Sequence, residues 1–135
     1  GRRSVHEKLF EQWAAGRPAR LYTDEIRQVC TADNFAAVLL ALALRLDLHG
    51  LFHWAGAEPA SRWQMGVGLC AHFGVPEKWI EPMTRADTPE AAAKRPRDLT
   101  LDVEPLDREL GVPRETLAEA TRGLVRPKWA ESLQL

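Results

Sequence analysis

The spacing of apolar residues predicts two helices in the first half of the chain. The first begins at a Ser-x-x-Glu capping box over residues 4–7 and ends at Gly16 and Pro18. The second begins at Thr31, a residue type that caps helices, and closes near Gly50. Its broad apolar stripe consists of Phe35, Val38, Leu39, Leu42 and Leu46. A stripe of this width predicts a helix that packs against a core.

A third helix is predicted from a second capping box, at residues 61–64, to Gly74 and Pro76. Gly66 and Gly68 lie inside it, where each costs roughly 1 kcal/mol relative to alanine. We therefore expect close backbone packing at both glycines.

The pattern of apolar residues after Pro76 is less regular. Residues 81–98 are rich in proline, alanine and charge, which predicts a loop with at most one helical turn. Asp102 can cap a helix that ends at Gly111, and Pro113 suits the first turn of a last helix.

Two short segments have strand character. Residues 19–23 lie between Pro18 and two acidic residues, which suits a brief strand at a sheet edge. Residues 51–54 are mostly apolar on consecutive positions, which predicts a buried strand with cover on both faces and favours a parallel sheet. Two or three strands with four or five helices make a thin sheet for an α/β domain, so we expect part of the fold to be missing.

Composition and charge narrow the class of protein. The chain has 135 residues, 45% of them hydrophobic and 27% charged, as expected for one globular domain. A formal net charge of −1 argues against nucleic acid or an anionic membrane as partner. The longest apolar stretch, residues 35–44, is half of a bilayer span, and no signal peptide is recognised. Two cysteines form no disulfide framework, so we expect a cytoplasmic, reduced setting.

Several kinds of chemistry have no support in the sequence. There is no glycine-rich phosphate turn, because the glycines at 66 and 68 fall within a predicted helix. The four histidines lack metal-ligand spacing, so no metal site is predicted. Tyr22 lacks a lysine one helical turn later, and neither Cys30 nor Cys70 has a paired base. We therefore expect no catalytic residue in this chain.

Two arginine-bearing segments remain, at residues 24–36 and 94–98. Arg27 follows an acidic turn and precedes the cap of the second helix, and Arg95 precedes the stiff residue Pro96. The planar guanidinium fork suits phosphate oxygens, so the two arginines together can clamp a diphosphate. The alternatives are a local pair of Arg27 with Asp24 or Asp33, and a solvated loop around Arg95.

Three stretches carry a resemblance to a known family. Residues 50–65 follow the order glycine, hydrophobic, aromatic, His-x-x-Gly-x-Glu-x-x-Ser-x-x-Gln-Met; residues 73–76 read Phe-Gly-Val-Pro; and residues 95–102 read Arg-Pro-x-x-x-x-Leu-Asp. In this order the chain resembles, over nearly its whole length, the C-terminal half of extended short-chain dehydrogenases/reductases acting on sugar nucleotides. The most similar group is the dTDP-4-dehydrorhamnose reductases. The regulatory subunit of methionine adenosyltransferase, a non-catalytic relative, shares the pattern.

The resemblance implies an α/β fold: the C-terminal, substrate-binding part of a Rossmann-type enzyme, with several helices and two or three short strands. Residues 1–135 would form a single sugar-nucleotide-binding lobe without the N-terminal dinucleotide-binding half. The implied function is the substrate-binding half of an NAD(P)-dependent reductase of nucleotide-activated 4-keto sugars such as dTDP-4-dehydrorhamnose. NADP or NAD would be bound by residues outside this chain. The partners would be the nucleotide sugar and the missing half, and a homodimer stays open.

The resemblance also implies roles for single residues. Arg27 and Arg95 match arginines that contact the nucleotide diphosphate in the wider family, and Arg97 and Trp54 are further substrate-binding candidates. Rhamnose-pathway reductases usually carry a small residue where Arg27 stands, so this position is closer to the epimerase and dehydratase pattern. The alternatives are therefore a sugar-nucleotide epimerase or dehydratase, a non-catalytic nucleotide-binding regulatory subunit, and a small helical interaction module.

Overall fold

The computed structural model describes residues 4–135, which form helices and short strands in an α/β arrangement. The helices are α1 (Val5–Ala14), α2 (Ala32–Ala43), α3 (Arg62–Phe73), α4 (Pro89–Ala93), α5 (Glu104–Leu110) and α6 (Leu117–Arg122). The strands are β1 (Ala19–Tyr22), β2 (Ile26–Arg27), β3 (Ala60–Ser61) and β4 (Ile80–Met83). Single 3-10 turns occur at η1 (Glu77–Trp79), η2 (Arg85–Asp87) and η3 (Lys128–Ala130).

The strands form two small sheets. β1 pairs with β4 in parallel, with Ala19 opposite Ile80. β2 pairs with β3 in antiparallel register, and its Ile26 also forms a parallel bridge to Asp98. Because β2 lies between β3 and the segment around Asp98, the two arginine-bearing segments of the sequence run side by side.

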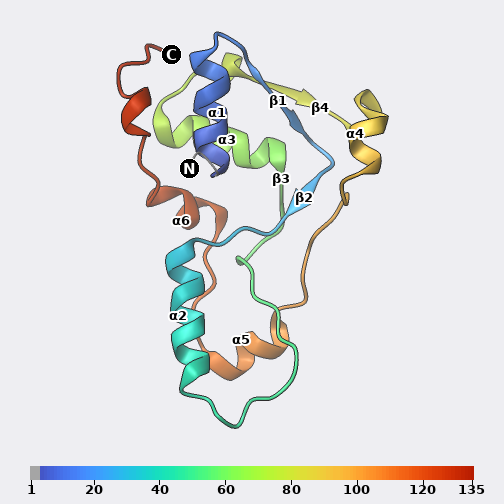
Figure 1. Ribbon diagram of the computed structural model, residues 1–135, viewed down its shortest axis with the longest axis vertical. Helices are drawn as coiled ribbons and strands as arrows, with labels where there is room; N and C mark the ends of the chain where they lie inside the picture. The colour runs from blue at the N-terminus through green and yellow to red at the C-terminus, as the bar shows by residue number, and fades with distance from the viewer. Residues whose placement is uncertain (1–3) are drawn as a thin grey trace.

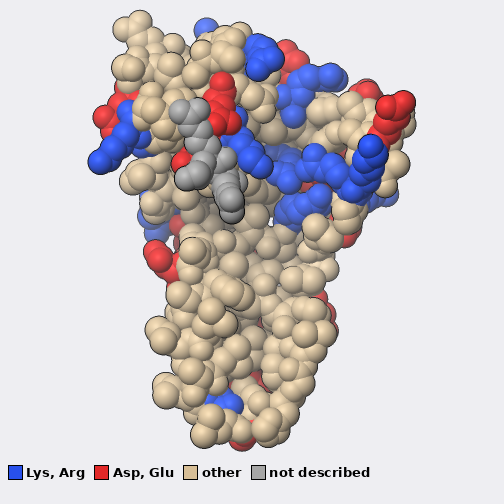
Figure 2. All heavy atoms as spheres, in the orientation of Figure 1, with Lys and Arg blue, Asp and Glu red and all other residues tan. Residues whose placement is uncertain are grey.

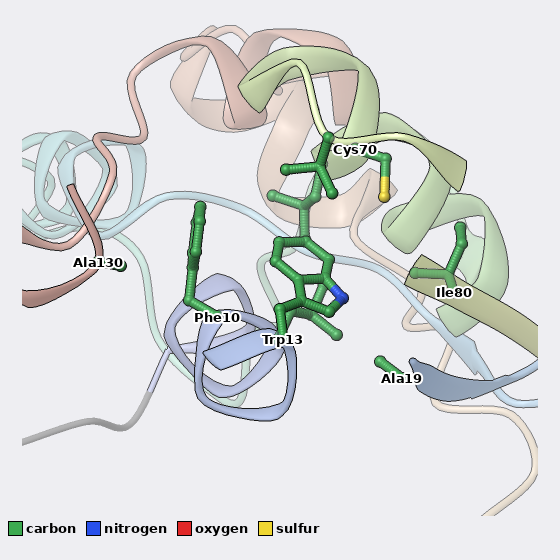
Figure 3. Close-up of a cluster of buried hydrophobic side chains, with 9 residues drawn as sticks. Phe10, Trp13, Ala19, Cys70, Ile80 and Ala130 are labelled. Carbon is green, nitrogen blue, oxygen red and sulfur yellow. The ribbon is translucent and has the colours of Figure 1, made fainter. Parts of the chain in front are cut away.

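The upper part of the molecule holds the larger core, between α1, α3 and the β1–β4 sheet (Figures 1 and 3). Phe10 and Trp13 meet edge to face in its centre, with ring centroids 5.0 Å apart. The indole Nε1 of Trp13 donates to the carbonyl oxygen of Trp79 at 2.8 Å, so even the polar atom of this side chain is satisfied.

The lower part consists of α2, α5 and the long connection between α2 and β3 (Figure 1). Its smaller core is built on Val38, Trp54 and Leu106. The indole of Trp54 donates to the side-chain oxygen of Asn34 at 2.8 Å, which ties the connection to α2.

The predicted capping signals at the starts of α1, α2 and α3 are confirmed, whereas two other predicted ends are wrong: α2 ends at Ala43 and not near Gly50, and α5 begins after Val103 and not at an Asp102 cap. Glu7 and Ser4 form the predicted capping box of α1, and Thr31 accepts a hydrogen bond from the amide of Asn34 at 3.0 Å. Ser61 caps α3 in the same way, and α3 ends at Gly74, whose φ of 65° is left-handed. These signals are reliable because cap and capped amide are three residues apart.

The close approach predicted for Gly66 is confirmed, whereas that for Gly68 is wrong. A Cβ atom on Gly66 would lie 2.2 Å from the Cδ1 atom of Leu21 on β1, whereas one on Gly68 would meet nothing within 4 Å. The two glycines lie on different faces of α3, and only one face meets the sheet.

Three predicted elements are also corrected. Residues 51–54 form no strand, and the predicted loop over residues 81–98 contains most of β4. The last helix begins at Leu117, behind a Thr116 cap, and not at Pro113. The sequence did not predict β4 because Pro82 lies inside it, and proline is rare inside strands that pair on both sides. Within the described chain β4 pairs with β1 alone, so the missing amide of Pro82 is tolerated.

The apolar stripe of α2 is buried only in part. Val38 is buried, but Phe35, Leu39 and Leu46 are exposed. Within residues 4–135, no helix has the length and apolar character to cross a membrane.

Candidate functional site

The candidate site is built around a buried carboxylate, that of Glu25. The residue lies in the turn between β1 and β2, and its exposed fraction is 0%. Its carbonyl oxygen accepts a hydrogen bond from the first amide of α3, that of Arg62, at 3.1 Å. A carboxylate removed from water is stable only when cations and hydrogen-bond donors surround it.

Four arginines surround this carboxylate. They come from β2, from the start of α3, from η2 and from the segment after α4. The contacts are Arg27 Nη2 to Oε2 at 3.2 Å, Arg95 Nη2 to Oε2 at 3.2 Å, Arg85 Nη1 to Oε1 at 3.5 Å and Arg62 Nε to Oε2 at 3.6 Å. We call this set, with Glu25, the arginine cluster.

The arginine cluster carries an excess of positive charge, because one carboxylate faces four guanidinium groups. Burial lowers the pKa of the Arg62 guanidinium, and the charges of Arg95 and Arg27 lower it further. The Nε atom of Arg62 is buried and has no hydrogen-bond partner among the described residues. An anion beside the exposed guanidinium atoms of the cluster would relieve the repulsion between the arginines.

Arg27 holds the site together through its hydrogen bonds. Its Nη1 atom donates to the carbonyl oxygens of Ile26 and Arg97 at 2.5 and 3.3 Å. Its Nη2 atom donates to Glu25 Oε2 at 3.2 Å and to the carbonyl oxygen of Pro96 at 3.1 Å. With only 14% of its side chain exposed, Arg27 connects β2 to the Arg-Pro-Arg segment.

Arg95 is the most exposed member of the cluster. Its side chain is 41% exposed, and its guanidinium carbon lies 5.7 Å from the centre of the Tyr22 ring. Figure 2 shows Lys and Arg side chains gathered on the upper right of the molecule, at the height of β2 and α4 in Figure 1. Arg95 therefore offers guanidinium donors to solvent from a fixed position.

Arg97 belongs to the same surface through its backbone. Its carbonyl oxygen accepts from the amide of Ile26 at 2.8 Å, and its own side chain is exposed. The structure thus places Arg27, Arg95 and the backbone of Arg97 beside one another, and their role in substrate binding stays a prediction.

Trp54, the remaining candidate, lies away from the arginine cluster. Its ring is buried in the lower core, and its only polar atom is bonded to Asn34. Trp54 therefore packs in the described chain, and its assignment as a substrate-binding residue stays a prediction.

Three members of the cluster were missed by the sequence analysis: Glu25, Arg62 and Arg85. Arg62 was passed over as a position inside a capping box, and Arg85 fell in the predicted loop. The available signal was an acidic pair directly after an apolar strand, since Asp24 and Glu25 both turn inward. Asp24 accepts from the amide of Arg85 at 3.0 Å and so holds η2 beside the cluster.

The cluster lies apart from two cavities of the chain. One, of about 370 Å³, is lined mainly by apolar residues of α3, α6 and the 29–32 segment. The other, of about 510 Å³, lies between α3 and α6. No arginine of the cluster lines either cavity, so the cluster is a surface site in this chain.

The chain is similar to one known protein family and to several well-described proteins. A family model described as "RmlD substrate binding domain" matches residues 2–128. Methionine adenosyltransferase 2 subunit beta from Bos taurus is 33% identical over 70 residues, which are 52% of this chain and 20% of that protein. The same subunit from Xenopus tropicalis is 29% identical over 87 residues, or 62% of this chain and 25% of that protein. The chain thus spans about a fifth to a quarter of the length of these relatives.

Solved structures share the fold at low identity. dTDP-4-dehydrorhamnose reductase from Yersinia enterocolitica has a TM-score of 0.65 at 17% identity, over 85% of this chain and 41% of that one. UDP-N-acetylglucosamine 4-epimerase from Bacillus cereus has a TM-score of 0.67 at 12% identity, over 90% and 42%. WbmG from Bordetella bronchiseptica, solved with NAD and UDP, has a TM-score of 0.65 at 14% identity, over 90% and 37%.

Proposed function

Because this chain belongs to the family of RmlD substrate binding domains, we propose that it binds the diphosphate of a nucleotide sugar on the arginine cluster. Residues 1–135 act as one substrate lobe. The reaction served is the NAD(P)-dependent reduction of a nucleotide-activated 4-keto sugar such as dTDP-4-dehydrorhamnose, with the reacting groups contributed by protein outside this chain.

The observation that carries the proposal is the convergence of Arg27 and Arg95 on one carboxylate oxygen, each at 3.2 Å. Two guanidinium groups from distant segments, backed by Arg62 and Arg85, form a site with net positive charge. A diphosphate offers several anionic oxygens, which planar guanidinium forks bind through paired, charge-assisted hydrogen bonds. Anion binding matches both the charge and the donors of the cluster.

The residues of the arginine cluster have different roles in the proposed diphosphate binding. Arg95 contacts the diphosphate directly, because its side chain is the most exposed of the four. Arg62 adds positive charge behind the exposed arginines, with its Nε atom 3.6 Å from Glu25 Oε2, and Arg97 lies at the rim. Arg27 has fewer donors left for the anion, because its Nη1 and Nη2 atoms already donate hydrogen bonds to backbone carbonyl oxygens. Glu25 keeps the guanidinium groups together.

The nicotinamide cofactor does not fit the residues of this chain. Gly66 and Gly68 lie inside α3, so within the described residues they form no turn at a helix start that could cradle a dinucleotide phosphate. NADP or NAD binding is therefore assigned to protein outside this chain, and no hydride step is derived for its residues.

A titration with dTDP tests the proposal. Wild-type chain is compared by calorimetry with Arg95→Gln, in phosphate-free buffer of low ionic strength so that the charges are not screened. Loss of a hydrogen bond to a charged group weakens binding by about 1.5–3 kcal/mol, or roughly 10- to 150-fold. Arg108→Gln is the matched control, because Arg108 is 70% exposed and forms an exposed ion pair with Glu104. Equal dTDP affinity in wild type and Arg95→Gln would refute the proposed site.

A second candidate function is that of a nucleotide-binding regulatory subunit without turnover. It is favoured by the identity to methionine adenosyltransferase 2 subunit beta, 33% over 70 residues. Both candidates predict dTDP binding, so a different measurement separates them. The complete gene product, supplied with NADPH and a dTDP-4-keto sugar, oxidises NADPH if it is a reductase and leaves the NADPH absorbance unchanged if it is a regulatory subunit.

A further inference from the structure

Tyr22 is the only tyrosine in the chain, and it lacks the lysine that a catalytic tyrosine would need one helical turn later. It is the last residue of β1, and only 8% of it is exposed. A buried tyrosine hydroxyl usually has a hydrogen-bond partner. Here the hydroxyl oxygen lies 2.6 Å from the Oγ1 atom of Thr88, 66 residues further along the chain. This hydrogen bond ties the end of β1 to the start of α4.

The hydroxyl of Thr88 is used for this contact instead of for a helix cap. Thr88 directly precedes Pro89, the first residue of α4, and a threonine at that position commonly accepts a hydrogen bond from the first amides of its helix. Within the described chain, the Thr88 side chain accepts no such bond from α4. The hydroxyl therefore joins two distant segments and does not stabilise its own helix.

The placement of α4 depends on contacts of this kind. The helix has five residues, too few to be stable without tertiary contacts. Figure 1 shows it beyond the end of β4, on the right of the molecule. Ala92 is buried, and its carbonyl oxygen accepts a hydrogen bond from Arg85 Nη2 at 2.6 Å. Tyr22 and Arg85 thus hold α4 from opposite ends.

Arg95 follows α4 and takes its position from it. The amide of Arg95 donates to the carbonyl oxygen of Ala92 at 3.1 Å, which continues the last turn of the helix. The guanidinium carbon of Arg95 lies 5.7 Å from the centre of the Tyr22 ring, a favourable place for a cation. Tyr22 therefore contacts one residue just before α4 and one residue just after it.

We propose that Tyr22 is a positioning residue for Arg95, acting through its hydrogen bond to Thr88. The hydroxyl fixes the start of α4, and the ring adds a second support to the ion pair between Arg95 and Glu25. An arginine side chain loses rotamer freedom when it binds a ligand, and this cost is smaller if the side chain is already held. The inference rests on the proposed diphosphate site and adds to it a residue that acts through Arg95.

Calorimetric titration with dTDP, in the same phosphate-free buffer of low ionic strength, tests the role of Tyr22. Tyr22→Phe removes only the hydroxyl, and Thr88→Val removes its partner. Each variant should weaken dTDP binding about two- to tenfold, the range for one hydrogen bond between neutral groups. Thr23→Val is the matched control, because the neighbouring Thr23 hydroxyl donates to the carbonyl oxygen of Met83 at 3.3 Å and not to α4. This control should bind dTDP like the wild type.

The same change in an Arg95→Gln background separates positioning from a general loss of structure. If Tyr22 acts through Arg95, then Tyr22→Phe should cause no further loss of dTDP affinity once Arg95 is replaced. A general loosening of the fold would weaken binding equally in both backgrounds. Urea unfolding shows whether each variant is folded at the titration temperature. If Tyr22→Phe does not fold, Thr88→Val is carried through the same comparison.

The outcomes distinguish this inference from the proposed function. Wild-type dTDP affinity in both Tyr22→Phe and Thr88→Val, or an equal loss with and without Arg95, would overturn the positioning role. The diphosphate site would still stand if Arg95→Gln alone weakens binding. Equal dTDP affinity of wild type and Arg95→Gln would instead overturn the site and the role of Tyr22 with it.

Discussion

The Nη2 atom of Arg95 lies 3.2 Å from the Oε2 atom of Glu25, although the Arg95 side chain is 41% exposed and the Glu25 side chain is fully buried. Arg95 is partly exposed to solvent, whereas the Glu25 carboxylate is not. Glu25 therefore holds the Arg95 guanidinium in position from the buried side, and the solvent-exposed N–H donors of Arg95 stay available to a ligand.

Removal of the negative charge at Glu25 should destabilise the chain. Glu25→Gln keeps the size of the side chain but leaves four neighbouring guanidinium groups without their common counter-ion. Loss of one partner of a buried ion pair costs about 3–5 kcal/mol, and the low end applies here because the arginines are partly exposed. Urea unfolding measures the loss, and added pyrophosphate should restore stability to the variant more than to the wild type.

The matched control for this change is Glu104→Gln. Glu104 also pairs with an arginine, at 3.1 Å, but both side chains are about 70% exposed. Exposed pairs contribute roughly 0–1 kcal/mol, so this variant should unfold nearly like the wild type. If the two variants lose the same stability, Glu25 is not the centre of the cluster.

Gly56 is expected to tolerate no side chain. A Cβ atom there would lie 2.0 Å from the carbonyl oxygen of Val29 and 3.0 Å from that of Glu115. Both atoms are backbone, so Gly56→Ala should cost about 3 kcal/mol in the free energy of unfolding, the upper range for overpacking. Gly68→Ala should instead stabilise by roughly 0.5–1 kcal/mol, because Gly68 lies inside α3 with open space around it. Thermal unfolding of both variants measures these opposite changes. A Gly56→Ala variant as stable as the wild type would contradict the prediction.

Cys70 should make stability depend on pH in the alkaline range. Burial raises the pKa of its thiol to about 11, whereas an unfolded thiol titrates near 9.0. Between these values the unfolded chain loses the proton and the folded chain keeps it, so stability is lost as the pH rises from 9 to 11. A shift of this size corresponds to about 2–3 kcal/mol.

Comparison with Cys70→Ala isolates the contribution of this thiol, since other groups titrate over the same range. The stability advantage of wild type over Cys70→Ala should shrink by that amount between pH 9 and 11, measured by urea unfolding. A difference that stays constant over this range would show that the thiol of the folded chain titrates like that of the unfolded one.

The sequence by itself determined the helices with sharp ends. The caps of α1, α2 and α3 lie within three residues of the amides they bind, so short-range hydrogen bonding defines where these helices begin. The family motifs at residues 50–65 and 95–102 likewise sufficed to identify the α/β fold and the family, both of which are confirmed. The proposed roles of Arg27, Arg95 and Arg97 stay predictions.

Only the tertiary structure decided which side chains meet. Glu25 and Arg62 are brought together because β2 pairs with β3, and the Asp24 carboxylate holds Arg85 beside them. No local pattern encodes those contacts, since each joins residues far apart in the chain. Similarly, residues 51–54 have the composition of a buried strand, but a strand exists only where a partner accepts its backbone hydrogen bonds, and the described chain contains no such partner for them.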